Sequence, residues 1–366
     1  MRIAYVVCDR MPPRILFLTG GRNTPASRFR VHQYLPRLRA DGWDAVVRPC
    51  EPGMYEWPDG SGFFGKFRRF RALAKKVAHQ KRSMRDAAKF DLVYVERELM
   101  PYMSPRLERR LASRNKNIIY DLDDAVFLKY GQSEPNPIAE VMRASHTVIA
   151  GNQWLLEWAL PHNPNAHMIP TPIDTDAWKP DWTKPDTMPD GRERSLVVVW
   201  TGTSGNLPML KPVATALARA RERAPRMAFR VVCDRPPPDD LFPGCQFVPW
   251  HADAEIKSVQ SADIGLMPLP DDSWSKGKCG FKLLQYMACG LPSLASPVGV
   301  NAEVLDEGCG YCVRSTEEWE EALVRLLMDP ALRVEMGRKA RKRAEERYSV
   351  GALYPQWKAA LESALT

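Results

Sequence analysis

The sequence predicts an α/β protein made of two Rossmann-like, doubly wound parallel-sheet domains that face each other across a cleft. Three observations support this prediction. Short strand-like runs alternate with helical stretches over 14–150, a proline-rich segment interrupts them over 161–194, and the alternation restarts at 195. A chain of 366 residues also favours two domains over one core.

The first domain is expected over 1–168. Its short apolar, largely β-branched runs predict strands at 14–19, 43–48, 91–95, 117–120 and 147–150. A helix is expected over 27–40, between the first two strands, and residues 1–13 are expected to form a small extension ahead of the first strand.

The proline-rich segment predicts a linker. Proline fixes φ and has no N–H to donate, so it disfavours helices and central strands. We place the linker over 169–194, because the surrounding 161–194 segment has little hydrophobic periodicity and contains seven prolines: Pro161, Pro164, Pro170, Pro172, Pro180, Pro185 and Pro189.

The second domain is expected over 195–349, followed by a C-terminal amphipathic helix in 350–366. Its predicted strands are 195–200, 229–233, 264–267 and 293–295, and its predicted helices are 208–223, 281–288, 316–328 and 330–347. In a pair of such domains, ligands bind at the carboxyl ends of the strands, which places the site in the cleft.

Several classes of protein are disfavoured by composition. No apolar run approaches the ~20 residues that span a bilayer. The apolar run within residues 1–13 is too short for a secretory signal. Eight cysteines without scaffold-like spacing predict reduced thiols and a cytoplasmic protein. Cys309 and Cys312 have no second pair with ligand spacing, so we expect packing there and no metal.

A basic amphipathic helix is predicted over 63–88. Ten Lys or Arg and one acid, Asp86, lie between Lys66 and Lys89, and apolar residues recur every three or four positions. Its apolar stripe could face its own domain. Alternatively, it could face an anionic membrane surface, and the protein would then lie at the inner face of the cell membrane. Nucleic acid is the least favoured partner, because no recognition motif accompanies the charges.

The residues 276–292 predict a phosphate site. Glycines punctuate a loop that leads into the helix 281–288, and the N–H groups of a helix N-terminus attract anions. We expect Lys278, Gly280, Phe281 and Lys282 to bind the phosphate here. A second turn, Gly202-Thr203-Ser204-Gly205, follows a strand and offers more N–H groups and two hydroxyls.

The run Tyr286-Met-Ala-Cys-Gly-Leu-Pro292 resembles the donor-site helix of retaining GT-B glycosyltransferases of the family four type, glycosyl transferase group 1. The family's two motif glutamates fall on Gly277 and on Gln285. The Gln285 side chain can still hydrogen-bond a ribose hydroxyl, whereas Gly277 has no side chain to replace the carboxylate. The resemblance implies a nucleotide-diphospho-sugar donor, UDP or GDP, no cofactor or metal, and retaining transfer to a glycan, lipid-linked or small-molecule acceptor. It also implies that the C-terminal helix crosses back to the first domain.

In the first domain, the resemblance places Gly20, Gly21, Arg28 and Arg30 on the cleft side, facing the donor phosphate and the acceptor. The family often has a histidine at the position of Asp123.

Asp121, Asp123 and Asp124 form the sharpest acidic cluster. Because neighbouring carboxylates repel, we expect a raised pKa for one of them. Asp123 or Asp124 would deprotonate or orient the acceptor hydroxyl, and Lys282 would stabilise the leaving group.

Other interpretations of the acidic cluster remain open. It also resembles the haloacid-dehalogenase phosphatase motif, although Ala125 stands where that motif has Thr or Val, and the metal-binding Asp-x-Asp of the other glycosyltransferase fold. A structural turn that caps the next helix is a further alternative. For the whole chain, a nucleotide-sugar epimerase and a non-catalytic nucleotide-sugar-binding protein are the alternatives.

Overall fold

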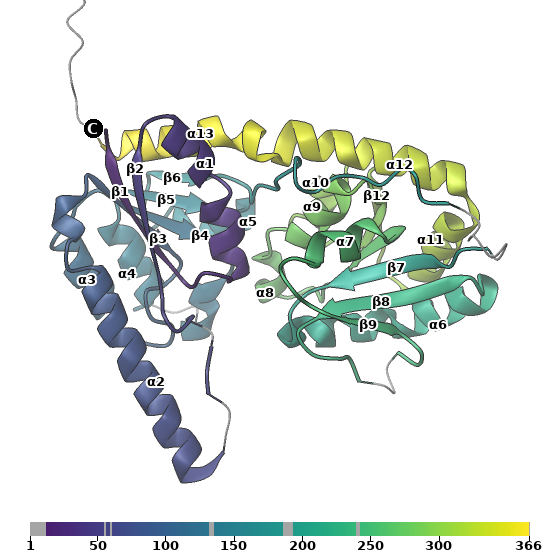
Figure 1. The fold of residues 1–366 in the computed structure, drawn as a ribbon, viewed down its shortest axis with the longest axis horizontal. Helices are drawn as coiled ribbons and strands as arrows, with labels where there is room; N and C mark the ends of the chain where they lie inside the picture. Colours follow the sequence, from purple (N-terminus) through teal and green to yellow (C-terminus); the bar gives the residue numbers. More distant parts are fainter. Residues whose placement is uncertain are drawn as a thin grey trace, which may run out of the picture.

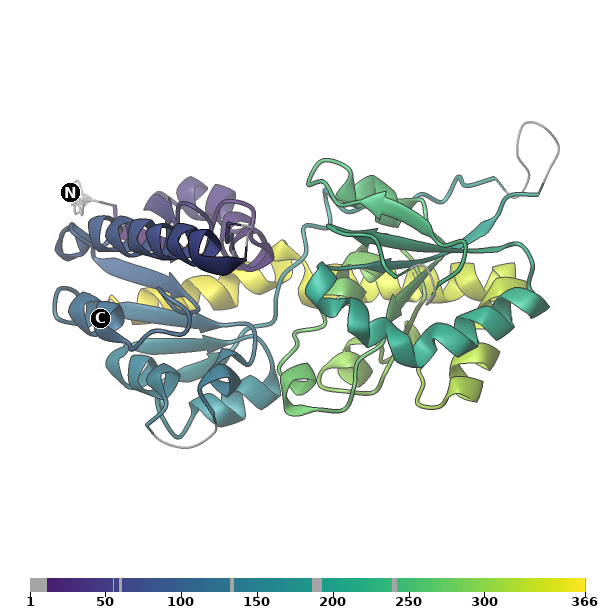
Figure 2. The same ribbon diagram turned by 90° about the horizontal axis from the view of Figure 1, so that it is seen from below.

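A computed structural model describes residues 12–54, 56–58, 61–131, 135–185, 193–238 and 242–365. Two α/β domains lie side by side, joined by a linker and by a helical segment that runs along both (Figures 1 and 2). Most of the extension expected at 1–13, and the linker residue Pro189, lie outside the described residues.

The first sheet has six parallel strands in the order β2-β1-β3-β4-β5-β6. The strand order reverses between β1 and β3, where ligands bind in open α/β sheets. The strands are β1 (Arg14–Thr19), β2 (Asp44–Pro49), β3 (Leu92–Glu96), β4 (Ile118–Leu122), β5 (Thr147–Ala150) and β6 (Ala166–Met168).

Helices cover both faces of this sheet because its strands are apolar on both sides. In β1, Ile15 and Phe17 face one core, and Leu16 and Leu18 face the other. The helices of this domain are a π-helix (Ser27–His32), α1 (Leu35–Ala40), α2 (Gly62–Ser83), α3 (Arg106–Ala112), α4 (Pro137–Ala144) and α5 (Gln153–Ala159), with 3-10 turns at Ala87–Lys89 and Val126–Tyr130.

The second sheet is also parallel and six-stranded, in the order β12-β11-β10-β7-β8-β9. Its strand order reverses between β7 and β10. The strands are β7 (Leu196–Thr201), β8 (Met227–Cys233), β9 (Gln246–Pro249), β10 (Ile264–Met267), β11 (Ser293–Ala295) and β12 (Gly310–Cys312).

The helices of the second domain bury its two cores in the same way. They are a 3-10 helix (Ser204–Val213), α6 (Ala214–Arg223), α7 (Glu255–Gln260), α8 (Ser273–Lys276), α9 (Phe281–Ala288), α10 (Asn301–Val304), α11 (Thr316–Met328) and α12 (Pro330–Arg343). A π-helix (Ala344–Tyr348) then leads into α13 (Val350–Ser363).

The two-domain parallel-sheet prediction is confirmed, with differences in detail. The helix expected over 27–40 is interrupted between His32 and Leu35, and the proline-rich segment begins with an extra edge strand, β6. The helix expected over 208–223 begins as a 3-10 helix that contains Pro208 and Pro212. Proline cannot donate the α-helical hydrogen bond, so the α-helix begins only at Ala214.

Helix α13 follows the second domain in sequence but packs on the first (Figure 1). The Trp357 ring stacks on Tyr34 with centroids 4.4 Å apart and on Phe17 at 6.1 Å. Trp357 is almost fully buried, so this helix supplies part of the core of the first domain.

We therefore expect Trp357→Ala to lower the free energy of unfolding by ~3–5 kcal/mol, the usual cost of truncating a buried large aromatic. Chemical denaturation followed by circular dichroism measures this. Glu362→Ala, an exposed change on the same helix, is the control and should cost less than about 0.5 kcal/mol. Equal effects of the two changes would show that α13 contributes no core.

Within the described residues no helix is long and apolar enough to cross a membrane. The cysteines in that part of the chain are free, and Cys309 is buried. No group of three or more His, Cys, Asp or Glu among the same residues is arranged to hold a metal ion.

Candidate functional site at the domain junction

The three aspartates at the carboxyl end of β4 each have a different nearest cation, although Arg97 also lies 3.8 Å from Asp124. Asp121 accepts from Arg30 (Nε to Oδ2, 3.0 Å), and Asp123 accepts from Arg97 (Nη2 to Oδ2, 2.9 Å). Asp124 pairs with Lys278 of the second domain (Nζ to Oδ2, 3.0 Å).

The expected raised pKa in this cluster is wrong for Asp123. Burial works to raise the pKa of Asp123, but the Arg97 guanidinium outweighs it and the net pKa is lowered. Asp123 is therefore a carboxylate at neutral pH.

The expectation that Arg30 faces the cleft is wrong. Its side chain is 2% exposed, and besides Asp121 it donates to the carbonyl oxygen of Ile169 at 2.8 Å. A fork-shaped guanidinium can hold a carboxylate and a carbonyl together. Arg30 therefore fixes the start of the linker to the end of β4.

Arg97 is a site residue that the sequence analysis missed. It follows β3 directly and has φ of 56°, a left-handed conformation that non-glycine residues seldom adopt. Its position at the carboxyl end of a predicted strand was the one available signal. The ion pair with Asp123 cannot be inferred from sequence, because the two residues come from different strands.

Glu96, at the end of β3, holds the glycine loop that follows β1. Its Oε2 accepts from the Gly20 N–H at 3.3 Å and from the Ser27 hydroxyl at 2.5 Å. Burial raises the pKa of Glu96 to about 7, although these donors oppose the shift. Gly20 and Gly21 thus lie at the carboxyl edge as expected, but a buried carboxyl that the sequence analysis overlooked positions them.

Helix α9 is fixed at the point where the strand order of the second sheet reverses. The Tyr286 hydroxyl accepts from the Thr201 N–H (3.1 Å) and donates to the Leu266 carbonyl (3.2 Å), which links α9 to β7 and β10. Gly265 permits this approach, since a Cβ there would lie 2.3 Å from the Tyr286 ring. Gly280, with φ of 67°, makes the turn into the helix.

Lys282 lies in the first turn of α9, beside the turn after β7. Its Cε would be 3.1 Å from a Cβ on Gly202, and its ammonium lies 5.7 Å from the centre of the Trp200 ring. Burial, followed by the nearby Lys278, lowers the pKa of Lys282 to about 8. Among the described residues, none forms a hydrogen bond or ion pair with this ammonium.

The turn Gly202–Gly205 has less free hydrogen-bonding capacity than expected. The Ser204 N–H and hydroxyl both donate to Asp234, at 2.6 and 2.8 Å, and Thr203 Oγ1 accepts from Asn206. The Asp234 carboxylate therefore occupies the anion position at the start of the 3-10 helix. Lys282 and the N-terminus of α9 keep more capacity for an external anion.

The loop between α8 and α9 is docked on the first domain. Besides the Lys278–Asp124 pair, Asn152 Nδ2 donates to the carbonyl oxygens of Lys276 (3.2 Å) and Lys278 (3.1 Å). The Cys279 thiol donates to the Asp123 carbonyl at 3.1 Å. Gly277 faces Ala125 so closely that a Cβ at 277 would lie 2.5 Å from the Ala125 Cβ.

A second contact between the domains runs through Arg28. Its guanidinium donates to Glu255 at 2.7 Å, and Glu255 in turn accepts from the Gln285 amide at 2.8 Å. The Phe29 and Phe281 rings meet beside it with centroids 3.8 Å apart. Arg28 thus lies at the junction, as expected, whereas Gln285 is buried and its amide N–H is already bonded to Glu255.

A family model described as "Glycosyl transferases group 1" matches residues 196–329, which contain the turn after β7 and all of α9. The match covers most of the second domain. A stretch of 104 residues of this chain is 32% identical to a D-inositol 3-phosphate glycosyltransferase of Saccharomonospora viridis. That match spans 27% of this chain and only 23% of the length of the relative.

Solved structures extend the likeness to both domains. HepE of Anabaena, in complex with UDP and glucose, aligns with a TM-score of 0.63 at 15% identity over 95% of this chain and 99% of its own. Sucrose-phosphate synthase of Thermosynechococcus elongatus aligns with a TM-score of 0.64 at 17% identity, over 96% and 99%. The chain therefore has the GT-B fold.

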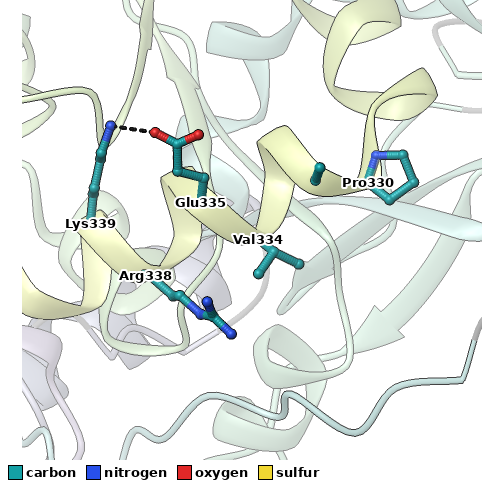
Figure 3. A pocket seen from close by; sticks show the side chains of 6 residues that line it. Pro330, Val334, Glu335, Arg338 and Lys339 are labelled. Atoms are coloured by element: carbon teal, nitrogen blue, oxygen red, sulfur yellow. Dashed lines mark hydrogen bonds and ion pairs between the residues drawn. The ribbon is translucent and has the colours of Figure 1, made fainter.

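A cavity of about 560 Å³ lies away from the junction, along α12 (Figure 3). It is lined by Pro330, Ala331, Val334, Glu335, Arg338 and Lys339, all from this one helix. Its only ion pair is Glu335 with Lys339, one turn apart. A helix flank with a local surface pair has no converging polar groups, so we assign it no role in the site.

We expect Gly277→Ala to push the domains apart, because the added methyl meets Ala125 atoms, including backbone. It should cost about 1–3 kcal/mol of stability and increase the radius of gyration in small-angle X-ray scattering. Gly205→Ala is the control, since a Cβ there meets nothing within 4 Å. An unchanged radius of gyration would mean that this contact does not hold the domains together.

The raised pKa of Glu96 predicts a pH effect on stability. Because the folded-state pKa exceeds the ordinary value of 4.5, its contribution is complete below about 4.5 and is lost as the pH rises through about 7. The shift corresponds to roughly 3 kcal/mol. Glu96→Gln should therefore gain stability relative to the wild type across this range, in urea titrations at several pH values.

The exposed Glu335→Gln is the control for this titration and should follow the wild type throughout. A Glu96→Gln difference that does not vary with pH would show that the pKa of Glu96 is the same in the folded and the unfolded protein.

Proposed function

We propose that this protein is a glycosyltransferase that moves a sugar from a nucleotide-diphospho-sugar to an acceptor hydroxyl, with retention and without a metal ion. One observation carries the proposal: the Lys282 ammonium lies at the N-terminus of α9, beside the Gly202 turn, and has no hydrogen-bonding or ionic partner among the described residues. A cation without a partner at a helix N-terminus is a receptor for an anion.

A diphosphate suits this receptor in charge, because a lysine at a helix N-terminus attracts anions. The named complexes of HepE contain UDP or UDP-glucose, and this chain shares the GT-B fold of HepE. We therefore propose UDP as the first choice of donor nucleotide and GDP as the second. Gly202 leaves room for the Lys282 stem, and Gly280 turns the chain so that the N–H groups of Phe281 and its successor begin α9. Thr203 and Ser204 shape the adjoining turn.

The chemistry follows from the charge that develops. The bond between the anomeric carbon and the diphosphate oxygen breaks, and its electron pair goes to the diphosphate. Lys282 would stabilise that charge in a partly desolvated site, where electrostatic effects are strongest. Lys278 would contribute after exchanging Asp124 for phosphate, because its charge is otherwise neutralised across the junction.

The acceptor would bind on the first domain, near Asp123 and Asp124. The low pKa of Asp123 makes it a poor general base but a good hydrogen-bond acceptor, so we assign it the orientation of the acceptor hydroxyl. The new glycosidic bond forms on the face that the diphosphate leaves, and the hydroxyl proton passes to the departing phosphate. We place this reaction in the cytoplasm, with a glycan or lipid-linked acceptor.

We expect nucleoside-diphosphate affinity to fall as the pH rises through about 8, because Lys282 then loses its proton. Thermal shifts with UDP, GDP, ADP, CMP and dTDP, with and without Mg²⁺, identify the base, since a ligand at a hundredfold its Kd adds about 2.7 kcal/mol. Lys282→Met should bind at least about tenfold more weakly and lose the pH dependence.

The exposed Lys276→Ala is the matched control and should bind as the wild type does. No shift with any nucleotide would overturn the donor site. Binding without transfer to any acceptor would favour the non-catalytic alternative, to which the absent carboxylate at Gly277 lends weight. Turnover of the donor sugar without an acceptor would favour an epimerase, and the anomeric proton coupling of the product tests retention.

A further inference from the structure

Helix α2 consists of two halves with different surroundings. From Ala72 onward it packs on the first domain, where Leu73 and Val77 contact the core and Gln80 is buried. Over 61–71 every residue except Gly65 is exposed. The first half of the helix projects from the domain into solvent (Figure 1).

Four phenylalanines lie on this projecting half. Phe63, Phe64, Phe67 and Phe70 are 79%, 80%, 52% and 67% exposed. Phe63, Phe67 and Phe70 follow the spacing that places side chains on one side of a helix, and the Phe63 and Phe64 rings contact each other at 5.9 Å. A contiguous exposed apolar patch of this kind marks an interaction surface.

Cations surround these phenylalanines. Lys66, Arg68, Arg69, Arg71 and Lys75 are all exposed, and α2 contains no acidic residue. The Arg71 guanidinium lies 6.0 Å from the Phe67 ring centre. Lys76, which the sequence analysis counted in the same cluster, is not available, because it is buried and donates to the Met54 and Glu56 carbonyls.

We propose that residues 63–71, which we name the α2 tip, insert their phenylalanines into the interfacial region of a bilayer that contains anionic phospholipids. Aromatic rings gain free energy when they enter the boundary between headgroups and acyl chains. The flanking Lys and Arg side chains then reach the phosphate groups, as in surface helices with an apolar side and a basic side. The sequence hypothesis that the stripe faces its own domain holds only for the second half of α2.

The topology orients such a contact. Helix α2 runs back from the carboxyl end of β2 to the amino end of β3, so its N-terminal tip projects at the carboxyl edge of the first sheet. Gly20, Glu96 and Asp123 lie at this same edge. A membrane bound by the α2 tip would therefore lie on the side of the domain that carries the junction, and not on its far side.

Nucleic acid fits the tip less well than a bilayer does. Proteins that bind single strands combine cations with aromatic stacking platforms along a groove. The tip is a lone convex helix, and on it four phenylalanines would stay exposed to water if only the cations bound phosphate. A bilayer surface accommodates both kinds of side chain together.

The test is co-sedimentation of the full chain with vesicles of phosphatidylglycerol and phosphatidylcholine in equal parts, compared with pure phosphatidylcholine. Wild type should bind the anionic vesicles, more weakly at high salt. Changing the four phenylalanines to Gln, a good helix former, should weaken binding about tenfold or more. Changing Arg68, Arg69 and Arg71 to Gln should cost about fivefold for each cation.

The matched control changes Val334, Arg338 and Lys342 on α12 to Gln, which removes apolar surface and two cations elsewhere. It should bind as the wild type does. Because the tip contacts no core, its variants should keep the wild-type melting temperature.

Four results would overturn the proposal. The wild type would not bind anionic vesicles, or the phenylalanine variant would bind them as well as the wild type does. Alternatively, a labelled oligonucleotide would bind more tightly than the vesicles, which would assign the tip to nucleic acid. A dimer that dissociates in the phenylalanine variant, with no vesicle binding, would assign the tip to self-association. None of these results depends on a nucleotide-sugar, so failure here is distinct from failure of the donor site.

Discussion

The arrangement at the junction depends on the neutralisation of three aspartates at the carboxyl end of a single buried strand. Their cations come from the helix after β1, from the end of β3 and from the second domain. Such charges can be buried only with close partners, and removing one partner from a buried pair commonly costs about 3–5 kcal/mol. The Asp121–Arg30 pair also fixes the linker, so the charge balance at β4 and the placement of the second domain are coupled.

Much of the fold could be predicted because most strands have a recognisable local sequence pattern. The runs 14–19, 147–150 and 264–267 match β1, β5 and β10 residue for residue, and the helix expected over 281–288 is α9. Strands with weak patterns were missed, such as β9, whose residues are at best half-buried. A periodicity signal requires one apolar side, which this edge strand lacks.

The site was less predictable. Several predicted residues do lie in it, but the residues that bond to their side chains could not be predicted. Asp123 and Lys278 do lie at the junction, but only the fold brings Arg97 to the first and Asp124 to the second. Glu96 directly follows the strand predicted over 91–95, and its burial depends on the loop that closes over it. From sequence, Gly277 was interpreted as the loss of a motif glutamate. The packing against Ala125 shows that no side chain fits at that position.

The return of α13 to the first domain has a consequence for how the chain folds during synthesis. Phe17, Tyr34 and Tyr94 are made early, but the Trp357 ring against which they pack is made only after the second domain. The first domain therefore emerges from the ribosome with an uncovered aromatic groove while the whole second domain is translated. Exposed apolar surface of this kind is a binding site for chaperones, so we expect chaperones to cover this groove until helix α13 has been made.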